Sequence, residues 1–380
     1  MTALGAAGIH GGAMLPAFPA LRALLKPAET LLIALAGGVA FTLLGFPAGL
    51  VSGSVLAVAA AALLGRPVKV PLPLARVCYV IIGILLGAVV TPQTLKGFTT
   101  WPVSVALLMV AALGMIVATA SYLRVVHRWD PLSALMGASP GSMMQVIALS
   151  TELGADLRAV AIVQTLRVLL LTIGIPGGLA LFGLVAPSIP VIRGPAGGSS
   201  LAEIFLLVAV SSAVAFAVAR LRFPGGLLFG AMAGSGVLHG TGLVQAVLPW
   251  WIGSASMLVL GAVVGSRFAN TAFRLIIGYL GAAFGSFAVS LSIAALFALI
   301  VTHFFPFPIA NIVVAFAPGA QDTMMVLALA LHLDPVYVGA HHVARFLVVT
   351  FSVAIAARRI ARKASASRNC KRADEGGFEG

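Results

Sequence analysis

The chain has 380 residues, of which 61% are hydrophobic and only 9% are charged. A soluble globular domain carries about 25% charged residues, and its interior could not hide this much apolar surface. The composition therefore excludes a soluble protein and predicts an all-α, polytopic transmembrane bundle whose first partner is the lipid bilayer. Lysine and arginine total 23 against ten acidic residues, but they gather at the ends of apolar segments. They predict membrane topology and not direct nucleic-acid binding.

Residues 1–29 are expected to form an uncleaved, partly disordered lead-in, because no basic residue precedes Arg22 to give the charged start of a signal peptide. Two sets of five apolar segments follow, each segment a predicted membrane crossing. The first set is 30–46, 48–64, 77–90, 101–123 and 159–185, and the second is 201–219, 225–237, 251–264, 275–301 and 337–357. The basic tail, 358–380, is expected to be a disordered cytoplasmic extension.

The two sets of segments carry the same unusual residues at one spacing. Apolar sequence alone would repeat only leucine, valine and alanine, so a recurrence of special residue types indicates an internal duplication. The two predicted repeats are residues 30–193 and 194–357. The recurring pairs, each 178 positions apart, are Pro140 and Pro318, Gly141 and Gly319, Asp156 and Asp334, and Arg167 and Arg345.

A segment of different character lies between the fourth and fifth apolar segments of each repeat, at 132–153 and 309–331. Pro140-Gly141 and Pro318-Gly319 interrupt these segments. Proline lacks an amide hydrogen and clashes one turn back, and glycine is flexible, so each segment is predicted to be a broken or re-entrant helix.

The distribution of basic residues predicts which side of the membrane each connection faces. If the broken segments enter and return on one side and both termini are cytoplasmic, only Lys96 and Arg193 lie outside. That arrangement satisfies the positive-inside rule, with both termini cytoplasmic; the expectation of a bacterial plasma (inner) membrane comes from the family resemblance given below. Five crossings per repeat would turn the second repeat upside down, as in many secondary transporters.

Arg167 and Arg345 lie inside apolar segments, where a buried guanidinium is costly and indicates function. Each follows a polar side chain, Gln164 or His342, by three positions, so the two share a helix face. One interpretation is a pair of cationic sites beside the free amides of the broken helices, suited to an anion. The other is that each arginine ties down a carbonyl or pairs with an acid inside its own repeat.

The acidic and histidine residues also have two interpretations each. Asp156 and Asp334 precede apolar segments and are predicted helix N-caps. Asp322 has no acidic counterpart in the first repeat, and either couples a proton or cation or caps its half-helix. His341 and His342 are adjacent and therefore point to different helix faces, with no nearby ligand set, so neither a metal site nor any other cofactor is predicted.

The stretches from Pro140-Gly141 through Asp156 to Arg167, and from Pro318-Gly319 through His341-His342 to Arg345, resemble the duplicated AbrB membrane proteins over about residues 30–360. Where that family places an acidic residue, five positions after each proline, this chain has Gln145 and Thr323. Family labels include regulator of gene expression and ammonia monooxygenase.

Three function classes remain open from the sequence. A permease for a small solute, with an anion favoured by the arginines, fits the broken helices and the duplication. A membrane-bound ammonia monooxygenase would need converging metal ligands, and the seven histidines are scattered, so an enzyme is disfavoured. A regulator would act indirectly, because no soluble DNA-binding segment is present. The predicted substrate-binding residues are Pro140, Gly141, Ser142, Gln145, Gln164, Arg167, Pro318, Gly319, Asp322, Thr323, His342 and Arg345.

Overall fold

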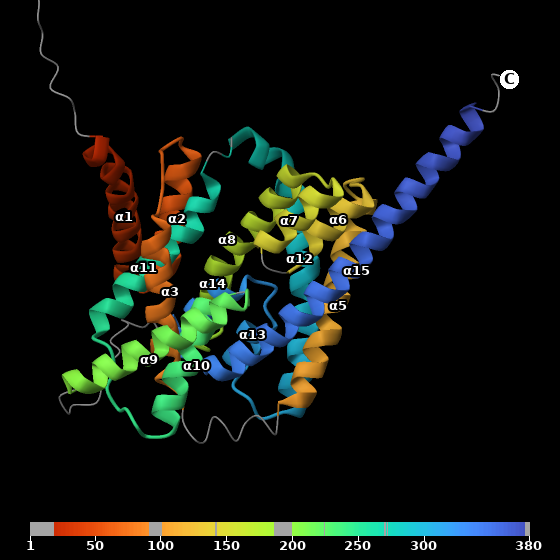
Figure 1. Cartoon of the computed structure of the whole chain (residues 1–380). Helices are drawn as coiled ribbons and strands as arrows, with labels where there is room; N and C mark the ends of the chain where they lie inside the picture. Colours follow the sequence, from red (N-terminus) through yellow and green to blue (C-terminus); the bar gives the residue numbers. More distant parts are fainter. Residues whose placement is uncertain are drawn as a thin grey trace, which may run out of the picture.

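The structure is a computed structural model that describes residues 19–90, 101–140, 143–185, 200–223, 225–269, 271 and 273–376. Over these residues the chain forms fourteen α-helices and a short 3-10 helix, and the described part contains no strand (Figure 1). Seven of the described helices are long and apolar enough to cross a membrane. The predicted all-helical, multi-pass membrane protein is confirmed.

The structure describes seven helices before residue 186. In order, they are α1 (Pro19–Leu43), α2 (Gly49–Leu63), α3 (Leu72–Gly87), α5 (Pro102–Val125), α6 (Pro131–Ala138), α7 (Met143–Leu153) and α8 (Leu157–Leu181). The second half contains α9 (Leu201–Arg220), α10 (Gly226–Gly240), α11 (Trp250–Gly265), η2 (Ser266–Phe268), α12 (Phe273–Phe304), α13 (Ile309–Phe316), α14 (Gln321–Ala330) and α15 (Pro335–Gly376). Several helix bounds lie 178 positions apart, most closely those of α3 and α11 and of α6 and α13.

Helices α2, α3 and α10 are shorter than the predicted crossings require. Each has 15 or 16 residues, which at 1.5 Å per residue spans about 24 Å at most, against a hydrocarbon core of about 30 Å. The structure therefore has seven helices of spanning length within the described residues, and ten full crossings stay a prediction.

Glycines bring the short helices of one half against those of the other. A Cβ atom added to Gly83 or Gly87 of α3 would collide with the backbone of α10, at Leu228 and Met232. The matching positions of α11, Gly261 and Gly265, meet the backbone of α2. Only glycine permits such a close approach of two backbones, so these positions hold helices of the two halves together.

The interruption of both predicted broken segments is visible in the helix bounds. α13 ends at Phe316 and α14 begins at Gln321, with Pro318-Gly319 between them. α6 ends at Ala138 and α7 begins at Met143. Proline accounts for both breaks, because its ring excludes the hydrogen bond that would continue the helix.

The last helix differs from the expectation for the tail. α15 continues as a helix through Gly376, whereas residues 358–380 are predicted from their composition to be disordered. Basic residues such as Arg358 and Arg359 are good helix formers, and a preformed helix upstream removes the need for a new nucleus. Figure 1 shows this end of α15 projecting beyond the rest of the bundle.

Candidate functional site

Arg167 projects from α8 onto the end of α6, next to the first break. Its side chain is buried and donates hydrogen bonds to the backbone oxygens of Ser139 (3.0 Å), Ala138 (3.4 Å) and Gly137 (3.5 Å). One turn earlier, Gln164 donates from Nε2 to the oxygen of Met136 at 2.9 Å. The last carbonyls of a helix have no intrahelical partner, so these two side chains replace the bonds that the break removes.

Arg345 does the same for the second break, from α15. It is 1% exposed and donates to the backbone oxygens of Ala317 and Gly319, the latter at 2.7 Å, and to Nδ1 of His342 at 2.7 Å. His342 Nε2 lies 3.1 Å from the oxygen of Val314. Because Nδ1 accepts from the arginine and Nε2 faces a carbonyl, His342 is the neutral tautomer with its proton on Nε2.

The same contacts occur at positions 178 apart in the two halves. Gln164 binds the oxygen of Met136, and His342 binds that of Val314. Of the two interpretations of the arginines, carbonyl binding within the same half is confirmed. The Nε atoms of both arginines are buried without a hydrogen-bond partner in the structure.

The aspartates at 156 and 334 are N-caps, as predicted. Asp156 accepts from the amides of Arg158 and Ala159, and Asp334 from those of Val336 and Tyr337. The backbone amide of each aspartate donates to a polar side chain in the helix before the break, namely Ser133 in α6 for Asp156 and Asn311 in α13 for Asp334. Each half-helix is thereby tied to the start of the helix that carries its arginine.

Asp322 lies in the first turn of α14 but is not its N-cap, a position taken by Ala320. One carboxylate oxygen accepts from the amide of Thr323. The other accepts from the hydroxyl of Tyr79, at 2.9 Å, and forms an ion pair with Arg267 in η2, at 3.1 Å. The side chains of Arg267 and Asp322 are 20% and 24% exposed, so this pair is only partly removed from solvent.

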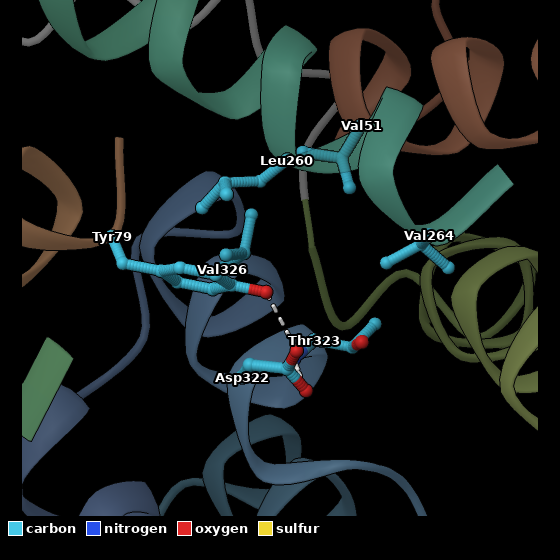
Figure 2. A pocket seen from close by; sticks show the side chains of 7 residues that line it. All are labelled: Val51, Tyr79, Leu260, Val264, Asp322, Thr323 and Val326. Atoms are coloured by element: carbon cyan, nitrogen blue, oxygen red, sulfur yellow. Dashed lines mark hydrogen bonds between the residues drawn. The ribbon is translucent and has the colours of Figure 1, made fainter. Parts of the chain in front are cut away.

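A cavity of about 10 Å³ lies beside this ion pair, room for about one water molecule. Figure 2 shows Tyr79 reaching toward Asp322, with Thr323 beside the carboxylate and valine and leucine side chains on the opposite wall. Thr323 Oγ1 is buried and has no hydrogen-bond partner in the structure. A buried hydroxyl without a partner is uncommon. Thr323 lines this cavity together with two other polar residues, Asp322 and Tyr79.

The structure divides the predicted site residues into three groups. Gln164 and Arg167 meet at the first break beside Pro140, and His342 and Arg345 meet at the second beside Pro318 and Gly319. Asp322 and Thr323 belong instead to the cavity of Figure 2. Gly141 and Ser142 lie outside the described residues, and Gln145 lies within α7.

The adjacent histidines have separate surroundings. His341 is fully buried; its Nδ1 lies 2.8 Å from the oxygen of Tyr337, and its Nε2 lies 2.9 Å from the hydroxyl of Ser104 in α5. His342 faces the second break. In the described part of the chain, no three His, Cys, Asp or Glu side chains come together as a metal-binding group.

Sequence reasoning missed Tyr79 and Arg267 as partners of Asp322. Both are distant in the chain, at separations of 243 and 55 positions. The available signal was an asymmetry, since the positions 178 earlier than Arg267 and Asp322 hold Val89 and Met144. Both charged residues thus lack a charged counterpart at the 178-residue spacing.

Comparison with known proteins gives a consistent result. A protein-family model described as "Transition state regulatory protein AbrB" matches residues 50–361. The chain is 27% identical over 290 residues to "Uncharacterized protein YhjN" of Bacillus subtilis (strain 168), covering 71% of this chain and 74% of that protein. It is 25% identical over 335 residues to "Putative regulator AbrB" of Escherichia coli (strain K12), covering 85% and 92%. Because the family model matches most of the chain and the fold is a helical membrane bundle, the chain belongs to the AbrB family of polytopic membrane proteins.

Proposed function

We propose that the protein is a permease for a small anionic solute, built from two inverted repeats, residues 30–193 and 194–357. The observation that carries the proposal is the pair of interrupted helices, each held by a buried arginine that binds the carbonyls at its break. Interrupted helices at the interface of two repeats are how many secondary transporters form a binding site near the membrane midplane. Of the predicted site residues, Gln164 and Arg167 contact the first break, and His342 and Arg345 contact the second.

The packing supports an inverted relation between the repeats. Tyr122, near the end of α5, donates to the oxygen of Gly281, near the start of α12. Gly114, in the middle of α5, approaches Ile293 farther along α12, so the two helices run antiparallel. They occupy equivalent places in their repeats, and equivalent helices that run in opposite directions are what an inverted duplication requires.

The arginines act in this proposal as anchors of the breaks and as sources of positive potential. Their terminal nitrogens bind carbonyls and, for Arg345, also His342. Within the described residues, no carboxylate forms an ion pair with either arginine. Two buried positive charges attract an anion electrostatically, and the field is strong where water is scarce. A solute that binds between the two breaks would contact both repeats at once.

The test is a thermal-shift screen of the purified protein in detergent against small inorganic anions and small carboxylates, followed by transport in proteoliposomes. A ligand that binds the folded state raises its melting temperature. Replacing Arg167 or Arg345 by glutamine should remove that rise, whereas Arg66→Gln, which removes a surface arginine, should keep it. Wild-type binding in both interior variants would remove the proposed site.

Both termini are proposed to be cytoplasmic in a bacterial inner membrane. α2 contacts η2, and Gly265, just before η2, lies against Val55 and Ala59 in the later part of α2, which supports Arg66 and Arg267 being at the same end of the bundle. Cysteine labelling that found these two connections on opposite sides of the membrane would contradict the topology.

The name of the Escherichia coli relative favours a second candidate, a role in regulation. A regulatory effect could arise from the permease itself, because the level of a transported solute can control expression. Transcription that responds to the protein after transport has been abolished by an Arg345 variant would favour regulation as a separate activity.

A further inference from the structure

We infer that the solute pathway runs through three cavities, two along α3 and α14 and one beside η2 and the start of α12, and that the Arg267–Asp322 ion pair closes it at its narrowest point. This rests on the proposed permease function. The gate lies at a contact whose charged residues have no counterpart in the first half of the chain, and not at the arginine-anchored breaks.

The first cavity, which we call the wide cavity, has a volume of about 230 Å³. It is lined by the ends of α3 and α14, including Leu85 and Leu329, by Val247 in the connection between α10 and α11, and by His332 just after α14. Its walls are apolar apart from this histidine. Such a space is large enough for a small organic solute.

The second, which we call the narrow cavity, is the 10 Å³ space of Figure 2 and lies on the same two helices. α3 contributes Tyr79, and α14 contributes Asp322, Thr323 and Val326. From Asp322 to Leu329 is seven residues, which at 1.5 Å per residue is about 10 Å along the helix. The narrow cavity is thus the next space along α14 from the wide cavity.

The third, which we call the threonine cavity, has a volume of about 50 Å³ and is lined by Thr165 of α8, Thr271, Ile276 of α12 and Arg267. Arg267 therefore faces this cavity while its Nη2 binds Asp322 on the wall of the narrow one. Figure 1 shows the connection between α10 and α11 and the start of α12 at opposite ends of the bundle. The three cavities accordingly form a series from one end to the other.

The chemistry of the gate selects a small carboxylate or another oxyanion. The guanidinium of Arg267 binds a carboxylate now, and an anion that arrives through the threonine cavity offers it the same kind of partner. Exchange releases Asp322, and the Thr323 hydroxyl, which is buried without a partner in the structure, can then bond to the solute. Val89 and Met144 at the equivalent positions provide no such pair in the first half.

The experiment measures cysteine accessibility in right-side-out and inside-out membrane vesicles, using full-length chain with Cys78→Ala and Cys370→Ser. Single cysteines replace Leu329, Val326 and Thr271, one for each cavity, and the probe is the anionic thiol reagent sulfonatoethyl methanethiosulfonate. We expect Leu329→Cys to react from one side, Thr271→Cys from the other, and Val326→Cys slowly from both. Reaction of the two end positions from the same side would overturn the pathway.

Opening of the gate is tested on the Val326→Cys protein. Arg267→Gln or Asp322→Asn should speed its modification by about tenfold, as expected when a minor open state gains one order of magnitude in population. The matched control is Arg66→Gln, which breaks the exposed Arg66–Glu29 ion pair and should leave the rate unchanged. Exchanging the charges, Arg267→Asp with Asp322→Arg, should restore slow modification, which a misfolded protein would not do. Unchanged rates in both single variants would overturn the gate.

Charge selection is tested at Thr271→Cys with a cationic reagent, trimethylammonioethyl methanethiosulfonate. When each rate is expressed relative to that reagent's rate with a free thiol in solution, the anionic reagent should react faster than the cationic one. Arg267→Gln should abolish that preference. Equal relative rates with Arg267 present would overturn the assignment to anions. If solute binding fails in the thermal-shift screen while the labelling pattern holds, the proposal of an anion permease falls, and what stands is a gated, reagent-accessible pathway without an assigned solute. If binding succeeds and the labelling fails, the pathway alone falls.

Discussion

Removing Arg345 should destabilise the folded protein more than removing Arg167. Arg345 binds three buried acceptors, namely the oxygens of Ala317 and Gly319 and Nδ1 of His342. Arg167 has one short bond, to Ser139 at 3.0 Å, and two longer ones at 3.4 and 3.5 Å. The two arginines lie in equivalent positions and are similarly buried, so a comparison of the two alanine variants isolates the number of good hydrogen bonds.

The magnitude follows from the cost of leaving a buried acceptor without a partner, roughly 1–3 kcal/mol each. Arg345→Ala leaves three such acceptors, a loss between roughly 3 and 9 kcal/mol, whereas Arg167→Ala leaves one short bond unmade, a loss of roughly 1–3 kcal/mol. Removing a buried guanidinium also relieves a desolvation penalty, but that gain is common to both variants. The difference between the two unfolding free energies is therefore about 2 kcal/mol or more.

The assay is reversible unfolding in mixed micelles with increasing sodium dodecyl sulfate, followed by the fluorescence of the four tryptophans. Arg66→Ala, which removes an arginine with 67% side-chain exposure, is the control and should change the free energy by less than about 0.5 kcal/mol. Arg345→Lys should recover only part of the loss, because an ammonium group cannot bridge acceptors in a fixed fork. A larger loss for Arg167→Ala than for Arg345→Ala would refute this account of the breaks.

Two further predictions concern other contacts. His342→Gln should fold and retain the bond to the oxygen of Val314, since Gln164 makes the equivalent bond in the first half. His342→Ala should lower the free energy of unfolding by about 1–3 kcal/mol. Equal unfolding free energies for the two variants would contradict the role of this bond. Gly83→Ala should reduce the yield of folded monomer on size-exclusion chromatography, because its Cβ would meet the backbone of α10, while Gly278→Ala, with open space around it, should fold normally. A normal yield for Gly83→Ala would show that α3 and α10 can separate at little cost.

Much of the helical framework follows from local signals in the sequence. The apolar segment predicted at 275–301 is α12, and the one at 225–237 lies within α10 except for its first residue. The segment predicted at 77–90 begins earlier, at Leu72 in α3, because Arg76 interrupts the apolar run without interrupting the helix. A proline and glycine in the middle of an apolar stretch predict the breaks, since both residues act on their own backbone.

The candidate site is less accessible to sequence reasoning. Spacing places Arg167 on one face with Gln164, but it cannot decide between a ligand and a carbonyl as partner. Asp322 meets Arg267 only because α14 and η2 come together in the folded bundle, and no periodicity encodes a contact over 55 positions. Patterns report what a residue does to its own helix, whereas the partner of a buried charge depends on tertiary packing.

The glycine crossings between α2 and α11 and between α3 and α10 also constrain how the chain is made. α2 and α3 are synthesised well before their partners α11 and α10. Both are shorter than the hydrocarbon core, so each alone has an unfavourable hydrophobic mismatch. Until α10 and α11 are inserted, the glycine-containing faces of α2 and α3 are exposed to lipid or shielded by the insertion machinery. Synthesis that stops between the halves would therefore leave a substrate for membrane proteases and not half of a working protein.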